Sequence, residues 1–454
     1  METKRGSFTG GLGFVLAAAS SAIGLGNLWR FPYLAAQYGG GIFILVYIVL
    51  ALTFGFTLMT TEIAIGRKTG KSPILAYEAL SKKFSFLGYL AALVPVIILP
   101  YYCVIGGWVI KYITVYLTGE HMEAGANGGA DYFAEFSGST VSPLVFFLIF
   151  LAFTMIVVLA GVEKGIEKFS KVLMPILFIL MIGISIYVMF LPGSIDGLIY
   201  YFKPDFSKFS YKTVCGAMGQ MFYSMSLAMG IMITYGSYMK KDVNINKSVS
   251  QIEIFDTLVA FLAGMMIIPV LYASGGEEAL KASGPGLMFM SLPSTFADMP
   301  AGRIVGLAFF VLVLFAAVTS SVSVMEAIVS CVMDKFKIKR KTATIGTFIA
   351  ALVMGIPSSL GFGVWSDIKP LGMDFLSFFD YVSNNVLMPI VAFITCIMIG
   401  WVLGTKVVEE EVTVGGYKFS RKALYDFMIK FVAPVILLGI LVVYTLATFG
   451  IIIL

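Results

Sequence analysis

Charged side chains are scarce in this sequence. Asp, Glu, Lys and Arg make up only 13% of its 454 residues, whereas a soluble domain carries about 25%. Hydrophobic residues reach 59% and the mean hydropathy is +0.94, against a usual hydrophobic share of about 45–50%. This composition excludes a soluble enzyme, a disordered chain and a secreted disulfide scaffold.

Histidine and cysteine are almost missing as well. The one histidine, His121, lies among acidic residues, which argues against a histidine-ligated catalytic metal and against a histidine-based triad. The four cysteines stand far apart in apolar stretches and include no CxxC motif, so we expect buried thiols. No GxxxxGK[ST] nucleotide motif and no nucleophile–base pair occur. The sequence therefore predicts that the protein is not an enzyme.

What the sequence has in abundance is long apolar runs. A bilayer core is crossed by about 20 apolar residues in a helix, and continuous runs of that length indicate helices and not strands of a barrel. We predict an all-α polytopic membrane protein with eleven spans: 11–37, 41–66, 86–117, 142–160, 169–191, 213–239, 252–274, 302–333, 342–358, 375–403 and 428–453.

The distribution of positive charge predicts the orientation of these spans. With the N-terminus placed inside, the inner loops hold 23 of the 31 Lys and Arg residues, as the positive-inside rule requires. The outer loop 118–141 carries four acids and no Lys or Arg. We therefore expect a cytoplasmic N-terminus, an outer C-terminus and a basic face that contacts lipid and not nucleic acid.

Small and polar residues interrupt the first span, which contains SSAIGLGNLWRFPY from Ser20 to Tyr33. Gly24, Gly26 and Pro32 all weaken a helix. A break at mid-membrane would free backbone groups for ions or anionic ligands. A glycine-rich surface for close helix packing explains the same spacing equally well, so the residues alone leave both readings open.

Hydroxyl groups gather at membrane depth in two later spans. Ser224 and Ser226 lie in the middle of the sixth span, and Thr319, Ser320 and Ser321 lie in the eighth. Hydroxyl and carbonyl oxygens are hard donors that suit Na⁺, as they suit other hard cations.

Four strings in the chain together resemble the neurotransmitter:sodium symporter family, and in particular its bacterial LeuT-type amino-acid transporters. The strings are GLGNLWRFPY, GQMFYSMSLAMGIMITYGSY, FAAVTSS and GVEKGIEKFSKVLMP, and the likeness extends from Lys4 to about Trp401. Most members have twelve spans, so eleven spans indicate a bacterial subgroup without the last helix.

The resemblance implies a LeuT-type 5+5 inverted repeat with unwound spans 1 and 6. A ten-span core would occupy 1–403, with repeat one at about 11–191 and repeat two at about 213–403. A cytoplasmic loop at 404–427 and an eleventh helix at 428–454 would follow.

Two sodium sites are implied by the same resemblance. The first would use Ala22, Asn27, Ser224 and Asp256, where Asp256 stands at a position that is usually Asn, and the substrate carboxylate would complete it. The second would use oxygens of Ser20, Ile23, Ala316, Thr319 and Ser320.

The resemblance also implies the substrate class. Relatives that carry monoamines place Asp at the position of Gly24, so a glycine there leaves room for a substrate that brings its own carboxylate, and Tyr102 would hydrogen-bond that carboxylate. The implied contacts carry no formal charge: Ser21, Ala22, Gly24, Leu25, Gly26, Ile98, Tyr102, Tyr223, Ser224, Ser226, Met229, Ser320 and Val324. Met229 replaces a Phe of the leucine-type pocket, and because methionine is flexible, we expect bulky apolar and aromatic amino acids to fit.

Gate residues are implied too. Arg30 and Asp380 resemble the outer gate pair, and Arg5 and Asp334 resemble the inner pair, with Tyr238 nearby. Glu62 and Glu326 match acids or amides of the family, and we interpret both as structural.

We therefore predict a symporter that couples Na⁺ entry to uptake of neutral apolar L-amino acids by alternating access in a bacterial inner membrane. Two Na⁺ are expected and no Cl⁻, because Asp256 supplies a negative charge and the residue one turn later, Ala260, offers no anion site. An emptied Asp256 should take up a proton or another cation. An amino-acid-sensing receptor on the same fold remains the alternative. The oligomeric state, monomer or dimer, is undecided.

Overall fold

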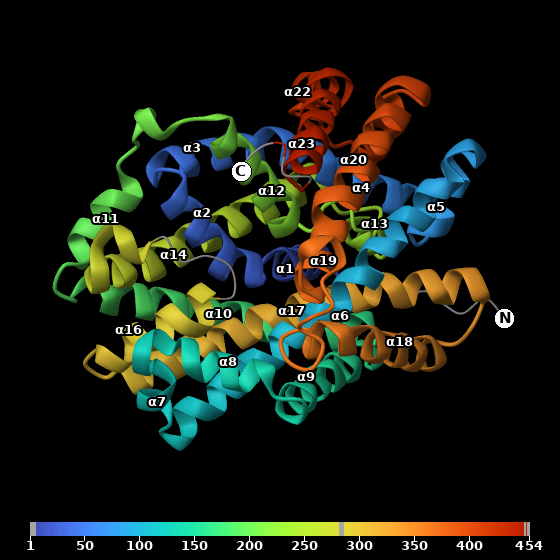
Figure 1. Cartoon of the computed structure of the whole chain (residues 1–454). Helices are drawn as coiled ribbons and strands as arrows, with labels where there is room; N and C mark the ends of the chain where they lie inside the picture. The colour runs from blue at the N-terminus through green and yellow to red at the C-terminus, as the bar shows by residue number, and fades with distance from the viewer. Residues whose placement is uncertain (1–5, 281–285, 449–450, 452–454) are drawn as a thin grey trace.

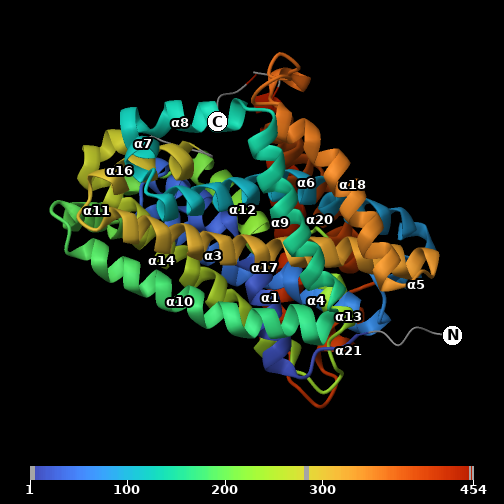
Figure 2. The ribbon, with the colours of Figure 1, turned by 90° about the horizontal axis from the view of Figure 1, so that it is seen from below.

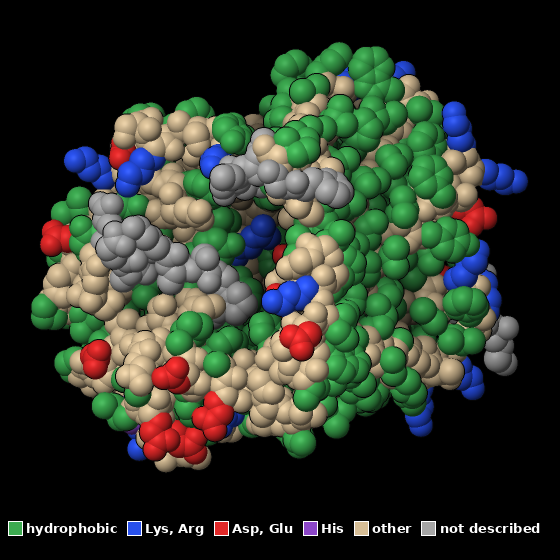
Figure 3. Space-filling model, viewed as in Figure 1, with side chains coloured by type: hydrophobic (Ala, Val, Ile, Leu, Met, Phe, Trp, Pro, Cys, Tyr) green, Lys and Arg blue, Asp and Glu red, His purple; other side chains and the backbone are tan. Residues whose placement is uncertain are grey.

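The chain is built from helices and short turns. The computed structural model describes residues 6–280, 286–448 and 451 (Figure 1), and within them no β-strand forms beyond one isolated antiparallel bridge between Gly40 and Pro204. Large hydrophobic side chains cover much of the outer face (Figure 3), as expected for a surface in contact with lipid. The predicted all-α membrane architecture is confirmed.

The helices of the first half are α1 (Gly11–Ala22), α2 (Phe31–Gln37), α3 (Gly41–Leu50), α4 (Phe56–Thr69), α5 (Pro73–Leu80), α6 (Ser85–Thr118), α7 (His121–Gly125), α8 (Ala130–Gly138), α9 (Val141–Leu159), α10 (Lys168–Met189) and α11 (Ser194–Phe202). Those of the second half are α12 (Tyr211–Ser224), α13 (Ile231–Ser237), α14 (Ile245–Ala279), α16 (Leu292–Asp298), α17 (Gly302–Phe336), α18 (Arg340–Leu360), α19 (Phe375–Asp380), α20 (Met388–Ile397), α21 (Lys406–Val412), α22 (Lys422–Phe427) and α23 (Ala433–Thr448).

Single π-helical turns continue several of these helices without interrupting the span. They are η1 (Gly26–Arg30), η2 (Ala51–Gly55), η5 (Val162–Glu167), η7 (Leu287–Ser291), η9 (Tyr381–Leu387), η10 (Met398–Val402) and η11 (Met428–Val432). Short 3₁₀ turns lie at η3 (Lys82–Phe84), η4 (Ala126–Gly129), η6 (Phe206–Lys208) and η8 (Pro370–Gly372).

Most of the expected spans appear as single runs. Among the described residues, nine helical runs are long and apolar enough to cross a membrane, and α1 with η1 and α2 adds a tenth that is bent by 52°. The expected sixth span differs, because α12 and α13 are separated by the non-helical residues 225–230. The seventh run begins at Ile245, ahead of the expected 252, since its helix continues into polar residues outside the apolar stretch.

Two long helices run side by side through the middle of the molecule (Figures 1 and 2). They are α6 and α17, and α17 also contacts α1, α9, α10 and α18. Tyr102 in α6 and Ser320 in α17 therefore face the same interior region from two helices whose positions are fixed by extensive packing.

Glycine is required at the break between α1 and η1. After Ala22 the backbone turns extended at Ile23, and helix resumes at Gly26. A Cβ at Gly24 would lie 2.6 Å from the Ser320 hydroxyl oxygen, and one at Gly26 would lie 2.4 Å from the Tyr223 ring. Both readings of the spacing therefore hold, since the span is broken and its glycines also allow close packing.

The break in the sixth span is held by strained backbone and a buried acid. Ser226 and Ala228 adopt positive φ angles of 54° and 58°, which cost a non-glycine residue roughly 1–2 kcal/mol each. The Ala228 amide donates a hydrogen bond of 2.6 Å to Glu62 Oε1 of α4. This bond fixes an amide that the broken helix leaves without a helical partner.

We predict that Glu62→Ala lowers the free energy of unfolding by about 1–3 kcal/mol, because the buried Ala228 amide loses its acceptor. Glu62→Gln keeps an acceptor oxygen and should lose less than half of that amount. Thermal and chemical unfolding of the purified variants in detergent would measure both effects. Equal losses in the two variants would contradict the role of the acceptor.

Candidate functional site

A small cavity lies between the two broken spans. Its volume is about 20 Å³, which is room for roughly one water molecule. Its lining contains no formal charge and comes from α1, η1 and the break between them, from α6 and α17, and from α12 and the break after it. The lining residues are Ser21, Ala22, Gly24, Gly26, Asn27, Ile98, Tyr102, Tyr223, Ser226, Met229, Ser320 and Val324. Apart from Asn27, an implied ion ligand, all of these are implied substrate contacts. Leu25 and Ser224 lie outside the lining.

Hydroxyl groups from other helices bind the backbone freed at the first break. Ser320 donates to the carbonyl oxygens of Ser21 and Ile23 at 3.1 Å each, and Ser226 donates to the Ser21 carbonyl at 3.1 Å. Polar groups in hydrocarbon are costly unless they are paired. These contacts therefore fix the ends of the two broken spans against α17.

Tyr102 reaches the same break from α6. Its hydroxyl oxygen accepts a 3.2 Å hydrogen bond from the Leu25 amide, and the Gly24 amide donates to the Asn27 side-chain oxygen at 3.1 Å. Amides that converge at the start of a half-helix suit an anionic group.

A carboxylate forms the centre of a second cluster beside the cavity. Asp256 of α14 is fully buried and accepts hydrogen bonds from Asn27 Nδ2 at 2.8 Å, the Ser224 hydroxyl at 2.5 Å and the Tyr47 hydroxyl at 2.6 Å. The sequence reasoning missed Tyr47. A single tyrosine inside the apolar run of the second span was the signal available.

The oxygen atoms implied for the first sodium site suit a hard cation. Ala22, Asn27, Ser224 and Asp256 offer carbonyl, amide, hydroxyl and carboxylate oxygens, and Asp256 carries the only formal charge among them. Oxygen-only sets with a carboxylate suit hard metal ions. The residues implied for the first sodium site therefore fit Na⁺ chemically.

The second implied set consists of neutral oxygens only. The Ser320 hydroxyl donates to the Ile23 carbonyl at 3.1 Å, and the Thr319 hydroxyl donates to the Ala316 carbonyl at 3.0 Å. The Ser20 hydroxyl instead contacts Ser170 of α10 at 2.7 Å, so only the Ser20 carbonyl remains for an ion. Neutral hydroxyl and carbonyl donors also fit a monovalent hard cation.

A wide vestibule adjoins this small cavity, with Tyr223 in the lining of both, and appears as the central hollow in Figure 3. Its volume is about 540 Å³, and Arg30, Asp380 and Tyr223 are among its lining residues. Arg30 lies over the Tyr223 ring at 5.7 Å, while Asp380 accepts a 2.6 Å hydrogen bond from Asn384. No ion pair within 4.0 Å joins Arg30 to Asp380 among the interactions of the described residues, so the two implied gate residues face one space without closing it.

The opposite end of the site is tightly packed. Arg5 lies outside the described residues, and Asp334 accepts a 2.8 Å hydrogen bond from the Ser72 amide. The Phe8 amide donates to the Tyr238 carbonyl at 3.1 Å, and the Phe8 ring packs on the Tyr238 ring. The described residues at this end are therefore held together by hydrogen bonds and ring packing.

A buried ion pair braces this packed end. Glu326 of α17 is fully buried and accepts two hydrogen bonds from the Arg340 guanidinium, at 2.6 and 2.8 Å, and one from the Tyr238 hydroxyl at 2.6 Å. The interpretation of Glu326 as structural omitted its contact with Tyr238. An acid in span 8 and an arginine at the start of span 9 were visible in the sequence, but not their contact.

Comparison with known proteins gives consistent results across the chain. The sequence profile of the "Sodium:neurotransmitter symporter family" matches residues 5–124 and 134–450. A sodium-dependent transporter of Bacillus subtilis is 33% identical, over 98% of this chain and 98% of the relative. A sodium-dependent transporter of Haemophilus influenzae is 32% identical, over 97% of this chain and 98% of the relative. The crystal structure of MhsT in complex with L-phenylalanine matches with a TM-score of 0.88 at 35% identity, covering 97% of this chain and 99% of that one.

We predict that Glu326→Gln destabilises the protein by about 3–5 kcal/mol, because it leaves the partly buried Arg340 without its counter-charge. The double variant Glu326→Gln/Arg340→Met should regain most of that loss, since no charge then remains unpaired. Unfolding measurements on both variants and on Arg340→Met alone would complete the cycle. Strictly additive losses would rule out the coupling.

Proposed function

Because the chain belongs to the sodium:neurotransmitter symporter family, we propose that this sodium-coupled transporter imports neutral, apolar L-amino acids, including aromatic ones. The observation that carries the proposal is the uncharged cavity at the junction of two broken spans, with a single carboxylate beside it. A zwitterion fits this arrangement, because its carboxylate can meet backbone amides and a cation while its side chain meets apolar groups.

The carboxylate end of the substrate is assigned to the first break. The Leu25 amide and the Tyr102 hydroxyl already meet there at 3.2 Å, and both can donate to a carboxylate. Gly24 leaves no side chain in the way, since even one carbon at this position would contact Ser320 and Tyr102. A substrate that brings its own carboxylate would thus complete the first sodium site.

The side-chain end is assigned to the apolar part of the lining, formed by Ile98, Met229 and Val324 with the ring of Tyr223. The cavity of about 20 Å³ is smaller than an amino acid, so these groups must move apart on binding. Met229 is the most adaptable of them, because its unbranched thioether repacks at low cost. The likeness to MhsT, whose structure holds L-phenylalanine, supports an aromatic substrate.

The ion sites supply the driving force in this proposal. Ala22, Asn27, Ser224 and Asp256 would hold one Na⁺, and Ser20, Ile23, Ala316, Thr319 and Ser320 a second. Two ions moving inward through about 100 mV gain roughly 4.6 kcal/mol, which corresponds to about 10³-fold accumulation of a neutral substrate.

Access alternates through the two gate regions. Arg30 and Asp380 would close the vestibule over the substrate, and the packed end, with Asp334 and Tyr238 and the implied partner Arg5, would open when the outer side closes. The charge bias supports an orientation with the packed end and the N-terminus in the cytoplasm of a bacterium. The vestibule and the C-terminus would then lie outside the inner membrane. Such bistable contacts form in one state and break in the other.

Uptake into vesicles tests this function directly. Purified protein in liposomes with an imposed inward Na⁺ gradient should accumulate radiolabelled tryptophan, phenylalanine or leucine, and unlabelled amino acid outside should drive counterflow. Binding without vectorial uptake would favour the alternative, an amino-acid-sensing receptor on the same fold. The absence of both Na⁺-dependent binding and uptake for every neutral amino acid would refute the substrate class.

We predict that Met229→Phe shifts selectivity toward smaller apolar substrates, because a rigid ring occupies space that methionine can vacate. The ratio of kcat/KM for tryptophan to that for leucine should fall by about tenfold or more, since one or two misplaced methylene-sized groups cost roughly 1–3 kcal/mol. Met122→Phe, an exposed position far from the cavity, serves as the matched control. Unchanged selectivity in Met229→Phe would remove this residue from the pocket.

We also propose chloride independence, with Asp256 as its cause. The zwitterionic substrate has no net charge, so two Na⁺ add two positive charges to a buried region. The negative charge of Asp256 lowers the net charge of that region to +1. The residue one turn later, Ala260, is buried and offers no anion ligand. The three donors on Asp256 support this role, because they fix a carboxylate at membrane depth where an isolated charge is costly.

Uptake should therefore persist when gluconate replaces Cl⁻, whereas Asp256→Asn should bind Na⁺ at least tenfold more weakly or become dependent on an anion. Asp367→Asn, on an exposed loop, should change neither property. Wild-type uptake that stops without Cl⁻ would refute the proposal. So would an Asp256→Asn variant whose Na⁺ and Cl⁻ dependence equals that of the wild type.

A further inference from the structure

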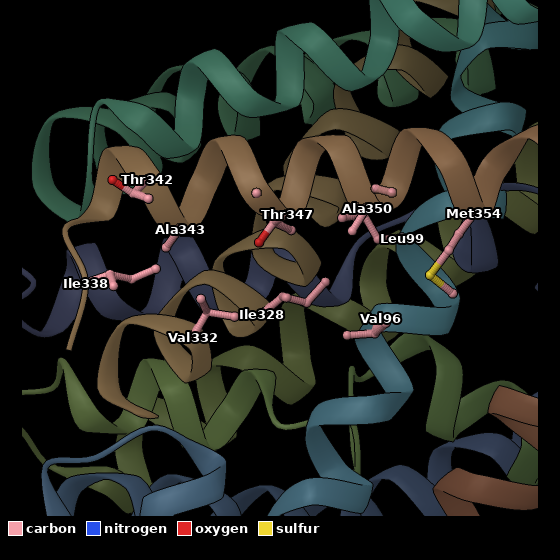
Figure 4. A pocket seen from close by; sticks show the side chains of 12 residues that line it. Val96, Leu99, Ile328, Val332, Ile338, Thr342, Ala343, Thr347, Ala350 and Met354 are labelled. Carbon is pink, nitrogen blue, oxygen red and sulfur yellow. The ribbon is translucent and has the colours of Figure 1, made fainter. Parts of the chain in front are cut away.

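An apolar groove that shares no lining residue with the vestibule opens on the surface of the molecule. Its volume is about 410 Å³, and it lies between α6, α17 and α18 (Figure 4). Val96 and Leu99 come from α6, Ile328 and Val332 from α17, and the rest mainly from α18. None of its lining residues belongs to the substrate cavity or to the two ion sites.

The groove is open because α18 presents small residues to it. Gly346 and Ala350 line the groove and are exposed, and a Cβ built at Gly346 would meet nothing within 4 Å. The neighbouring side chains Ile349 and Val353 are 54% and 60% exposed, so this surface of α18 faces the hydrocarbon of the membrane. Whatever fills the groove therefore enters from the lipid.

A polar group inside the groove has no partner. Thr347 is only 6% exposed, and its hydroxyl makes no hydrogen bond within the described part of the chain. In Figure 4 this hydroxyl points from α18 toward Ile328 and Val332. Threonine in a helix usually bonds to a carbonyl of the preceding turn, and an unpaired buried hydroxyl is costly. A ligand with an acceptor oxygen at this depth would satisfy it.

The entrance of the groove is basic. The turn between α17 and α18 exposes Lys337 and Lys339, and the first turn of α18 exposes Lys341. None of the three forms an ion pair with another described residue. Lys335 lies over the Tyr89 ring of α6 at 5.3 Å, an arrangement typical of a membrane–water interface. An acidic headgroup at this entrance would find several cations, and Lys337, Lys339 and Lys341 have no ion pair with a described carboxylate that it would have to displace.

We propose that this groove binds an anionic glycerophospholipid, with one acyl chain between α6, α17 and α18 and its headgroup at the basic turn. Thr347 lies seven residues into α18 from Arg340, about 10 Å along the helix axis. Long lysine side chains reach the phosphate level from the turn, and the ester carbonyl lies just below that level, since the interfacial layer is roughly 5–7 Å thick. The Thr347 hydroxyl then donates to an ester carbonyl oxygen.

A second copy of this chain fits the groove less well. A two-fold pair of α18 helices would bring two sets of these lysines together, and like charges across an interface oppose association. An acidic lipid has the opposite charge at the entrance and an apolar chain for the interior.

The test measures lipid binding to the whole protein, delipidated in neutral detergent, by native mass spectrometry and thermal unfolding. Phosphatidylglycerol should bind about tenfold or more tightly than phosphatidylcholine with the same acyl chains, because basic residues near a surface favour anionic lipid. It should also raise the Tm. Lys337→Gln/Lys339→Gln/Lys341→Gln should abolish this preference while leaving the weaker binding of phosphatidylcholine.

Two further variants separate the groove from the general protein surface. Gly346→Phe fills the open space and should eliminate the tight lipid, whereas Gly183→Phe, at an exposed α10 position where a Cβ also meets nothing, should bind as the wild type does. Thr347→Val should weaken phosphatidylglycerol binding severalfold without lowering the Tm of the lipid-free protein, because it removes an unpaired hydroxyl.

Equal binding of the two lipids by the wild type would overturn the proposal. So would tight phosphatidylglycerol binding retained by Gly346→Phe, or lost equally by Gly183→Phe. A dimer in lipid-free detergent that Gly346→Phe converts to a monomer would overturn it in favour of a second copy of the chain.

Discussion

The structure depends on one constraint: two helices are broken inside a membrane, and every backbone group freed there needs a partner. Water supplies none in hydrocarbon, so the partners must be side chains from other helices. Ser320 and Ser226 satisfy the first break through the Ser21 carbonyl, and Glu62 satisfies the second through the Ala228 amide. The breaks persist only because α4 and α17 bring these groups to them, and the central cavity exists only because the breaks persist.

Buried charge obeys the same rule. Asp256 stands at membrane depth within a ring of three donors, and Glu326 stands at the packed end with Arg340 and Tyr238. The two acids differ in the groups that balance the negative charge of their carboxylates. A fixed guanidinium neutralises Glu326 permanently, whereas Asp256 has only neutral donors and so keeps its affinity for a cation. This difference supports the proposal that Asp256 binds an ion, whereas Glu326 has a structural role.

The helix α17 connects the features that the function requires. Ser320 contacts the first break, Thr319 and Ala316 belong to the second implied ion site, and Glu326 braces the packed end. The proposed lipid groove uses the far side of the same helix. In the proposed transport cycle, the implied ion site, the substrate cavity, the packed end and the lipid groove would therefore all share contacts with this one helix.

The amino-acid sequence by itself determined the membrane class and most span boundaries. It also marked the first span as a weak helix, although the glycine spacing alone left a break and a close-packing surface equally open. Those features are local, since an apolar length decides a span and Gly24, Gly26 and Pro32 weaken a helix wherever they occur. The break at residues 225–230 was different, because that segment is as apolar as its surroundings and hydropathy does not distinguish it from helix; the family resemblance alone predicted it.

Only the tertiary structure decided which partners meet. Tyr47 lies 209 residues from Asp256 and Glu62 lies 166 from Ala228, and no periodicity in the sequence relates them. The size of the cavity, the gap between Arg30 and Asp380 and the pairing of Glu326 with Arg340 are likewise products of helix packing. Residue types and local breaks are fixed by short stretches of chain, whereas a binding site is a set of distances between helices that only the folded arrangement specifies.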